Sequence, residues 1–108
     1  RIPLVKHWAS KIGISIVFKG YVDILTDGKN MKLNDIHNKA MTVGGTGDVL
    51  AGIVGSLLSR GVNPYNSMRI SAFINGFAGN NVFKTKSYGL LPTDIIEEIP
   101  NILAKYIN

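Results

Sequence analysis

The sequence predicts an α/β fold, in which short strands are followed by a group of packed helices. Three patterns carry this prediction. Apolar residues recur with helical spacing near the start and through the second half, β-rich runs lie between residues 14 and 36, and many of the 12 glycines separate these segments. With 45% hydrophobic and only 18% charged residues, the 108-residue chain has the composition of a folded domain rather than of a disordered tail.

The chain opens with a predicted amphipathic helix. Leu4, Trp8 and Ile12 recur at a spacing of four, which indicates a helix over Pro3–Lys11. Gly13 follows and would end it, because glycine readily adopts the left-handed conformation that closes a helix.

Three strands are predicted next. The run Ile14–Lys19 is apolar and β-rich, which favours a strand covered on both faces in a parallel sheet. Val22–Thr26 and Met31–Ile36 flank Asp27-Gly28, and an Asp-Gly pair between two short strands is a strong hairpin signal. A polar, glycine-rich loop is expected over residues 35–47.

Two helices are predicted after this loop. The first covers Val49–Arg60 and ends at Gly61, and the second has Asn63 as N-cap and Pro64 at its first position. Small residues line one face of each helix, and we expect these two faces to form a close-packed pair. They are Gly52, Gly55, Ser56 and Ser59 in the first helix, and Ser71, Ala72, Asn75, Gly76 and Gly79 in the second.

A third helical stretch is predicted near the C-terminus. Thr93 is its expected cap, and Asp94 and Glu97 fall in its first turn, where negative charge is favoured. Pro100 is expected to break the helix or to restart it as a second segment over Pro100–Ile107.

Composition and charge exclude several functional classes. The chain has no cysteine, which excludes disulfides, zinc fingers, iron–sulfur ligation and cysteine nucleophiles. The net charge of +5 suits an anionic ligand such as a nucleotide, although ordinary surface lysine would give the same value. Lys and Arg are scattered, which argues against nucleic-acid binding. The longest apolar stretch, Val49–Leu58, is shorter than the roughly 20 residues that a membrane span needs.

The start of the chain indicates a piece of a longer protein. It begins at Arg1, without an initiator methionine or the layout of a signal peptide, and runs at once into an apolar segment. We therefore expect a fragment of a cytoplasmic protein.

The most informative stretch is Gly44-Gly45-Thr46-Gly47-Asp48, at the start of a predicted helix. Consecutive glycines let backbone N–H groups converge, and the helix dipole adds positive potential, so the loop suits a phosphate. A Walker A loop would have Lys where Asp48 stands. A dinucleotide fingerprint would have a third glycine where Leu50 stands.

A carboxylate beside a bound phosphate needs a reason, because the two charges repel. One reason is helix capping, since Asp is common in first turns. The other is catalysis, in which Asp48 accepts the proton of a hydroxyl that attacks the phosphate, while the glycine amides stabilise the charge on the phosphoryl oxygens.

The run NKAMTVGGTGDVLAG, from Asn38 to Gly52, resembles the signature of the nucleotide-dependent NAD(P)H-hydrate dehydratases, which are repair enzymes of the ribokinase-like group. Lys19–Asp23 resembles their Lys-Gly segment, and Gly89–Asp94 resembles the segment before their last helices. The resemblance extends from about residue 14 to residue 100. It departs from the family next to Asn38, where His37, Lys39 and Ala40 replace the glycine and proline residues that the family often has.

The resemblance implies a fold and a reaction. Residues 1–108 would form the C-terminal fragment of a single ribokinase-like, nucleotide-binding catalytic domain, inactive without the N-terminal part that supplies most of the sheet. The enzyme would be a lyase that phosphorylates the hydroxyl of hydrated NADH or NADPH and eliminates phosphate, with ADP giving AMP, or with ATP as co-substrate. Its partners would be these small molecules, and either further copies of itself or its own N-terminal part.

The resemblance also implies roles for individual residues. Asp48 would be the catalytic base and, together with Asn38, would bind the hydrate. Mg²⁺ would accompany the nucleotide, held by phosphates and water, and His37, with neither cysteine nor clustered acids around it, does not indicate a metal site. The nucleotide-binding residues would be Lys19, Gly20, Tyr21, Val22, Asp23, Gly44, Gly45, Thr46 and Gly47.

Two other functions remain open from the sequence. A kinase of the same fold, acting on a sugar or vitamin alcohol, would use the same aspartate and the same glycine loop. A non-catalytic interaction module is the alternative from a different class.

Overall fold

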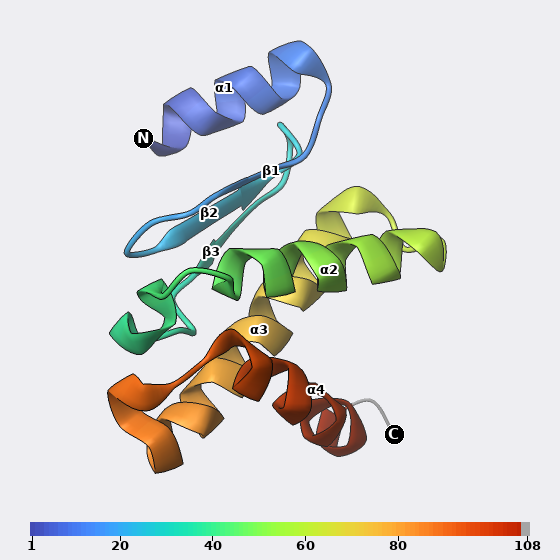
Figure 1. The fold of residues 1–108 in the computed structure, drawn as a ribbon. Coiled ribbons are helices and arrows are strands. Elements are labelled where there is room, and N and C mark those ends of the chain that lie inside the picture. The colour runs from blue at the N-terminus through green and yellow to red at the C-terminus, as the bar shows by residue number, and fades with distance from the viewer. Residues whose placement is uncertain (107–108) are drawn as a thin grey trace.

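The structure is a computed structural model and describes residues 1–106. A three-stranded sheet lies between helix α1 (Ile2–Ile12) on one side and the remaining helices on the other (Figure 1). The α/β class is as predicted. The helix α1 covers the expected segment and ends at Gly13, whose φ of 77° is left-handed and would strain any residue with a side chain.

The sheet is antiparallel throughout, with strand order β1-β2-β3. Strands β2 (Asp23–Thr26) and β3 (Met31–Asn34) form the predicted hairpin, in which Thr26 pairs with Met31. Strand β1 (Ile16–Phe18) pairs antiparallel to β2, so the prediction of a parallel neighbour is wrong within the described sheet. The reason is chain length, because the loop over residues 19–22 is far shorter than the dozen or more residues of a parallel crossover.

Three long helices follow the sheet. Helix α2 (Thr46–Ser59) starts three residues earlier than predicted, directly after the glycine loop, and helix α3 (Pro64–Lys86) is capped by Asn63 as predicted. Short 3₁₀ turns, η1 (Lys39–Thr42) and η2 (Ser87–Gly89), precede α2 and α4.

Helix α4 (Pro92–Tyr106) differs from its prediction in two ways, at its N-terminal cap and at Pro100. It begins at Pro92, and the carboxylate of Asp94, rather than Thr93, accepts a hydrogen bond from the N–H of Leu91 at 2.9 Å. The helix continues through Pro100 because Ile95 and Ile102, which are 0% and 2% exposed, anchor it in the core on both sides of the proline. Ile107, the predicted end of the second segment, lies outside the described residues.

Helices α2 and α3 pack against each other as predicted, but not through their small-residue faces. On α3 the face is buried against the segment before the glycine loop, where a Cβ at Gly76 would overlap the carbonyl oxygen of Ile36 and one at Gly79 would overlap the thioether of Met41. On α2, a Cβ at Gly52 or Gly55 would meet no atom within 4 Å. The two helices pack through larger apolar side chains instead, since Val49 and Ile74 share one core cluster.

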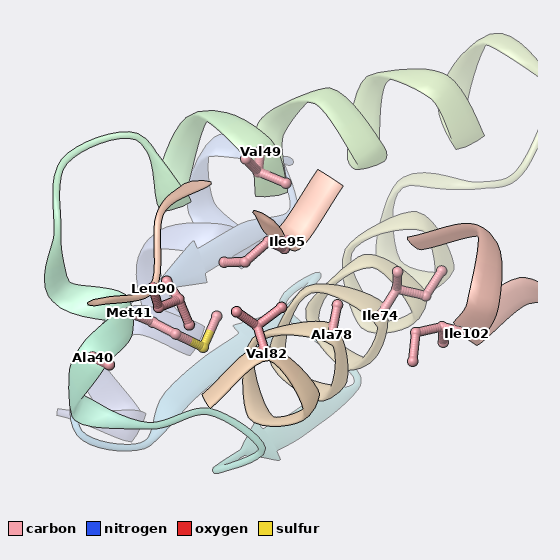
Figure 2. Close-up of a cluster of buried hydrophobic side chains, with 9 residues drawn as sticks. All are labelled: Ala40, Met41, Val49, Ile74, Ala78, Val82, Leu90, Ile95 and Ile102. Atoms are coloured by element: carbon pink, nitrogen blue, oxygen red, sulfur yellow. The ribbon is translucent and has the colours of Figure 1, made fainter. Parts of the chain in front are cut away.

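The main core lies where η1, α2, α3 and α4 meet. It is built from nine buried side chains (Figure 2): Ala40, Met41, Val49, Ile74, Ala78, Val82, Leu90, Ile95 and Ile102. A second cluster of Leu25, Met68 and Ala72 joins the sheet to α3. Because Met41 and Val49 stand on either side of the glycine loop, the core holds both ends of that loop.

Candidate functional site

The glycine loop has a backbone shape that glycine makes possible. Gly45 is the N-cap of α2 and adopts a φ of +107°, which residues with a side chain avoid. A Cβ at this position would also approach the ring of Pro92 to 2.8 Å. The loop therefore turns sharply into α2 and rests against the start of α4.

The outer side of the loop is open. A Cβ at Gly44 or Gly47 would meet no atom within 4 Å, so a ligand can approach the backbone there. The first N–H groups of a helix have no partner within it and carry its positive end, which makes them suited to a phosphate. The hydroxyl of Thr46 is occupied, since it donates to the carbonyl oxygen of Met41 at 2.6 Å and so fixes the loop rather than offering its proton to a ligand.

Asp48 is the third residue of α2, and its side chain is exposed. No side chain caps this helix, so within residues 1–106 the carboxylate is not used for the capping role considered from the sequence. It stands free beside the backbone N–H groups of the loop, where it can accept a proton from a group brought to the same place.

A cleft of about 760 Å³ runs along one side of the loop and gathers most of the residues that the sequence singled out. Thr46 and Gly47 lie at its edge, and Asn38 lines it from the segment before η1. The strand-loop residues Lys19, Gly20, Tyr21 and Val22 form its other wall. Residues 19–22 and 46–47, distant in sequence, therefore share one cavity.

Asp23 belongs to this wall but points inward. It is 1% exposed, and its carboxylate accepts hydrogen bonds from Lys19 Nζ at 3.0 Å, from the N–H of Gly20 at 3.1 Å and from Asn34 Nδ2 at 3.2 Å. Lys19 remains half exposed, so its ammonium lies at the surface of the cleft while Asp23 holds it from below. Asp23 shapes the wall instead of lining it.

Asn38 is fully engaged by the protein. Its Oδ1 accepts from the N–H of Ala40 at 3.0 Å, which caps η1, and its Nδ2 donates to Asn80 Oδ1 at 2.8 Å. These bonds tie the approach to the glycine loop to α3. The geometry therefore gives Asn38 an orienting role in the loop.

A second, larger hollow of about 1070 Å³ also borders the loop and lies between α2 and α4. Gly45 and Asp48 stand at its end, and its walls are mainly apolar, with Ile53, Leu57 and Ile96 among them. The loop thus borders both a cleft that carries two lysines and a groove with mainly apolar walls, and Asp48 lines the groove.

The cleft also contains residues that sequence reasoning did not assign to a site. Asp35, His37, Lys39, Met41 and Thr42 line it through their position just before the glycine loop, which is the signal that could have revealed them. Asn75 reaches the cleft from α3, and its place in a row of small residues pointed to packing alone.

Among residues 1–106, no group of three or more His, Cys, Asp or Glu side chains is gathered in a way that could hold a metal ion. None of the helices in the same range has the length and apolar character that crossing a bilayer requires.

Comparison with known proteins establishes the family. The Carb_kinase family model, described as NAD(P)H-hydrate dehydratase, matches residues 1–101. The chain belongs to the NAD(P)H-hydrate dehydratase family.

Curated relatives of this chain carry matching names. It is 44% identical over 95 residues to the bifunctional NAD(P)H-hydrate repair enzyme Nnr of Hyperthermus butylicus, covering 88% of this chain and 18% of that enzyme. It is 41% identical over 106 residues to the ADP-dependent (S)-NAD(P)H-hydrate dehydratase of Nitrosopumilus maritimus, covering 98% of this chain and 37% of that enzyme. The chain thus spans between about a fifth and two fifths of these relatives.

Solved structures show that the chain has a ribokinase-like fold. A ribokinase-like superfamily protein from Enterococcus faecalis superposes with a TM-score of 0.85 at 29% identity, over 98% of this chain and 37% of that one. The ADP/ATP-dependent NAD(P)H-hydrate dehydratase of Bacillus subtilis, co-crystallized with ATP/Mg²⁺, gives a TM-score of 0.88 at 24% identity, over 97% of this chain and 39% of that one.

Proposed function

We propose that this chain carries the catalytic loop of a nucleotide-dependent NAD(P)H-hydrate dehydratase, with ADP or ATP as co-substrate. The observation that carries the proposal is the carboxylate of Asp48, which is exposed and caps no helix, and which lies next to the glycine loop in the sequence. The family membership and the names of the curated relatives support the same reaction.

The nucleotide would occupy the cleft lined by residues 19–22 and 46–47. Its phosphates would bind the backbone N–H groups of residues 44–47, where the open side of Gly44 and Gly47 leaves room for them. Lys19, held in place by Asp23, would offset part of the phosphate charge. Tyr21 and Val22 would contact the remainder of the nucleotide.

The hydrate would approach from the side of Asp48. As its hydroxyl oxygen attacks the terminal phosphorus, Asp48 accepts the hydroxyl proton and the bond from phosphorus to the nucleotide breaks. The phosphorylated oxygen then leaves as inorganic phosphate, driven by the lone pair of the ring nitrogen. Loss of a proton from the neighbouring carbon restores the double bond, and the loop amides stabilise the phosphoryl oxygens during transfer.

Magnesium would enter with the nucleotide. Because residues 1–106 gather no cluster of three metal-ligating side chains, phosphate oxygens and water would be its main ligands. The ion would offset phosphate charge, while the chain itself supplies the loop amides, Lys19 and Asp48.

The test is a repair assay on the protein at its natural length. Purified hydrate of NADH or NADPH is incubated with ADP, with ATP or without nucleotide, and recovery of the dihydronicotinamide absorbance is followed. We expect recovery that requires a nucleotide and releases one phosphate for each ring restored. Recovery that does not depend on nucleotide would contradict the proposal.

The same assay separates the kinase alternative. A sugar or vitamin kinase would consume ATP only when its alcohol is supplied, and would leave the hydrate unchanged. We place the repair activity in the cytoplasm and expect the chain to act in a homo-oligomer or with the rest of its own domain.

A further inference from the structure

An unpartnered polar atom belongs to Asn75, a residue that lines the cleft. Asn75 is 4% exposed, and its Oδ1 has no hydrogen-bond partner among the described residues, although the side chain lines the cleft. Buried polar atoms in folded proteins are nearly always paired. An acceptor that is buried, unpaired and next to a ligand-sized cavity therefore points to a donor supplied by the ligand.

The position of Asn75 is rigid. The next residue, Gly76, lies so close to the carbonyl oxygen of Ile36 that a Cβ there would overlap it. This contact presses the segment before the glycine loop onto α3, and Asn38 and Asn80 join the same two elements by a hydrogen bond of 2.8 Å. Asn75 is thus held at a fixed place between α3 and the residues that line the cleft.

We propose that Asn75 selects the base of the nucleotide, by accepting a hydrogen bond from the exocyclic amino group of adenine. This inference rests on the proposed function, because it assumes that a nucleotide occupies the cleft. Asn75 would then be a specificity-determining residue, acting on a part of the nucleotide that takes no part in the chemistry.

The chemistry of the nucleotide favours the base amino group as the donor. Phosphate oxygens only accept, and ribose hydroxyls are common to all nucleotides and well satisfied by water. Adenine presents an amino donor beside a ring-nitrogen acceptor, whereas guanine presents a carbonyl oxygen where adenine has the amino group. That oxygen would face Asn75 Oδ1, and two acceptors repel.

A second unpartnered atom matches the ring nitrogen. His37 Nε2 is buried without a hydrogen-bond partner and also lines the cleft. In the tautomer that carries a proton on Nε2, His37 would supply a donor in the same cleft as the Asn75 acceptor, and the apolar parts of Val22 and Met41 there suit the faces of a purine.

The experiment compares binding of four probes to the natural-length protein by calorimetry: ADP, purine riboside 5′-diphosphate, 2′-deoxy-ADP and inorganic pyrophosphate. Purine riboside lacks only the amino group. We expect the unmodified protein to bind ADP at least about tenfold more tightly than the purine riboside analogue, because a buried acceptor left unpaired is strongly disfavoured. Asn75→Leu should lower the affinity for ADP to within about twofold of the affinity for the purine riboside analogue. The affinity for the analogue should stay almost unchanged.

Control variants isolate the contact. Ser71→Ala removes a neighbouring buried hydroxyl that is also unpartnered but does not line the cleft, and should keep the preference for ADP. Asn101→Ala removes an exposed amide on α4 and should keep it too. If Asn75→Leu does not fold, the comparison of ADP with the analogue on the unmodified protein still decides, since equal affinities overturn the inference.

The outcomes also separate this inference from the proposed function. If Asn75→Leu lowers the affinities for ADP and for the purine riboside analogue equally, the base contact is overturned. A change in affinity confined to 2′-deoxy-ADP would also overturn it and would assign the contact to ribose. If neither pyrophosphate nor any nucleotide binds, the proposed function fails as well. Binding of all the nucleotides without base preference would overturn this inference alone.

Discussion

The carboxylate of Asp23 holds the ammonium of Lys19 at 3.0 Å, one group buried and the other at the surface of the cleft. The same carboxylate accepts from the N–H of Gly20 and the amide of Asn34. A single buried acid therefore fixes the backbone and the charge of one cleft wall. This relationship distinguishes a residue that shapes the site from those that face a ligand.

The first prediction concerns this acid. Asp23→Ala would leave three donors without their acceptor, and unfolding free energy should fall by about 1–3 kcal/mol. Nucleotide affinity should fall as well, because Lys19 would lose its fixed position. Urea unfolding and nucleotide titration measure the two effects. Asp23→Asn, which keeps one acceptor oxygen, should lose less of both, and a variant that binds nucleotide normally would contradict the positioning role.

The second prediction compares two helical glycines. Gly76→Ala should lower the unfolding free energy by several kcal/mol, because its Cβ would overlap the Ile36 carbonyl. This loss is at least as large as that caused by adding a methylene group to a well-packed core. Gly52→Ala is the matched control. It has open space and should gain about 0.5–1 kcal/mol in the 108-residue chain from better helix propensity.

The Gly52 variant also reports on the exposed face of α2. In the 108-residue chain the space around Gly52 is open. If Gly52→Ala nevertheless destabilises the natural-length protein, another segment of that protein packs on this face of α2. Thermal unfolding of both variants in both lengths of chain gives the comparison. A Gly76→Ala variant as stable as the parent would contradict the close contact of α3 with residue 36.

The third prediction tests catalysis at Asp48. Asp48→Asn should lower turnover in the repair assay by at least about a hundredfold, because the amide cannot accept the hydroxyl proton. Its melting temperature should change little, since the carboxylate is exposed and caps no helix. Exposed Glu97→Gln on α4, which lines neither the cleft nor the groove, serves as a carboxylate control and should retain most activity. Near-normal turnover of Asp48→Asn would exclude it as the base.

The fourth prediction is a pH dependence at the start of α4. The hydrogen bonds from Lys86 and from the N–H of Leu91 lower the pKa of Asp94 below 3.8. A carboxyl with a lowered folded-state pKa contributes stability that is present above 3.8 and is lost as the pH falls through the folded value. Asp94→Asn should therefore melt below the parent at neutral pH, and the difference should close in strongly acidic buffer.

The same pair behaves in the opposite sense at high pH. Asp94 raises the pKa of Lys86 above 10.5, so the contribution of Lys86 is present below 10.5 and is lost as the pH rises through the folded value. Melting curves from acid to alkaline pH measure both limits. A gap between Asp94→Asn and the parent that stays constant in acid would refute the assignment. Salt should reduce the gap, because both groups are near the surface.

Local sequence predicted the elements well and their pairing less well. The hairpin at Asp27-Gly28, the Gly13 helix end and the Asn63 cap follow from backbone preferences of single residues, which act over a few positions. The break at Pro100 was wrong, and Ile16–Phe18 has an antiparallel neighbour within the described sheet, because both depended on what the rest of the fold packs around these segments.

The roles within the site divide in the same way. The glycine loop and its aspartate are recognisable in sequence because the required backbone angles and the carboxylate lie within five consecutive residues. Asn75 gave no such signal, since its relation to the cleft arises only when α3 packs on the segment before the loop.

The sequence by itself determined the α/β class, the family and the phosphate-type loop, since these depend on contiguous residues. Tertiary structure alone decided that Asp23 turns inward, that Asn38 is tied to Asn80, and that Asp48 lines the groove between α2 and α4 rather than the cleft that carries Lys19. The physical reason is that burial and the pairing of polar atoms depend on segments far apart in the chain, which meet only when the core closes.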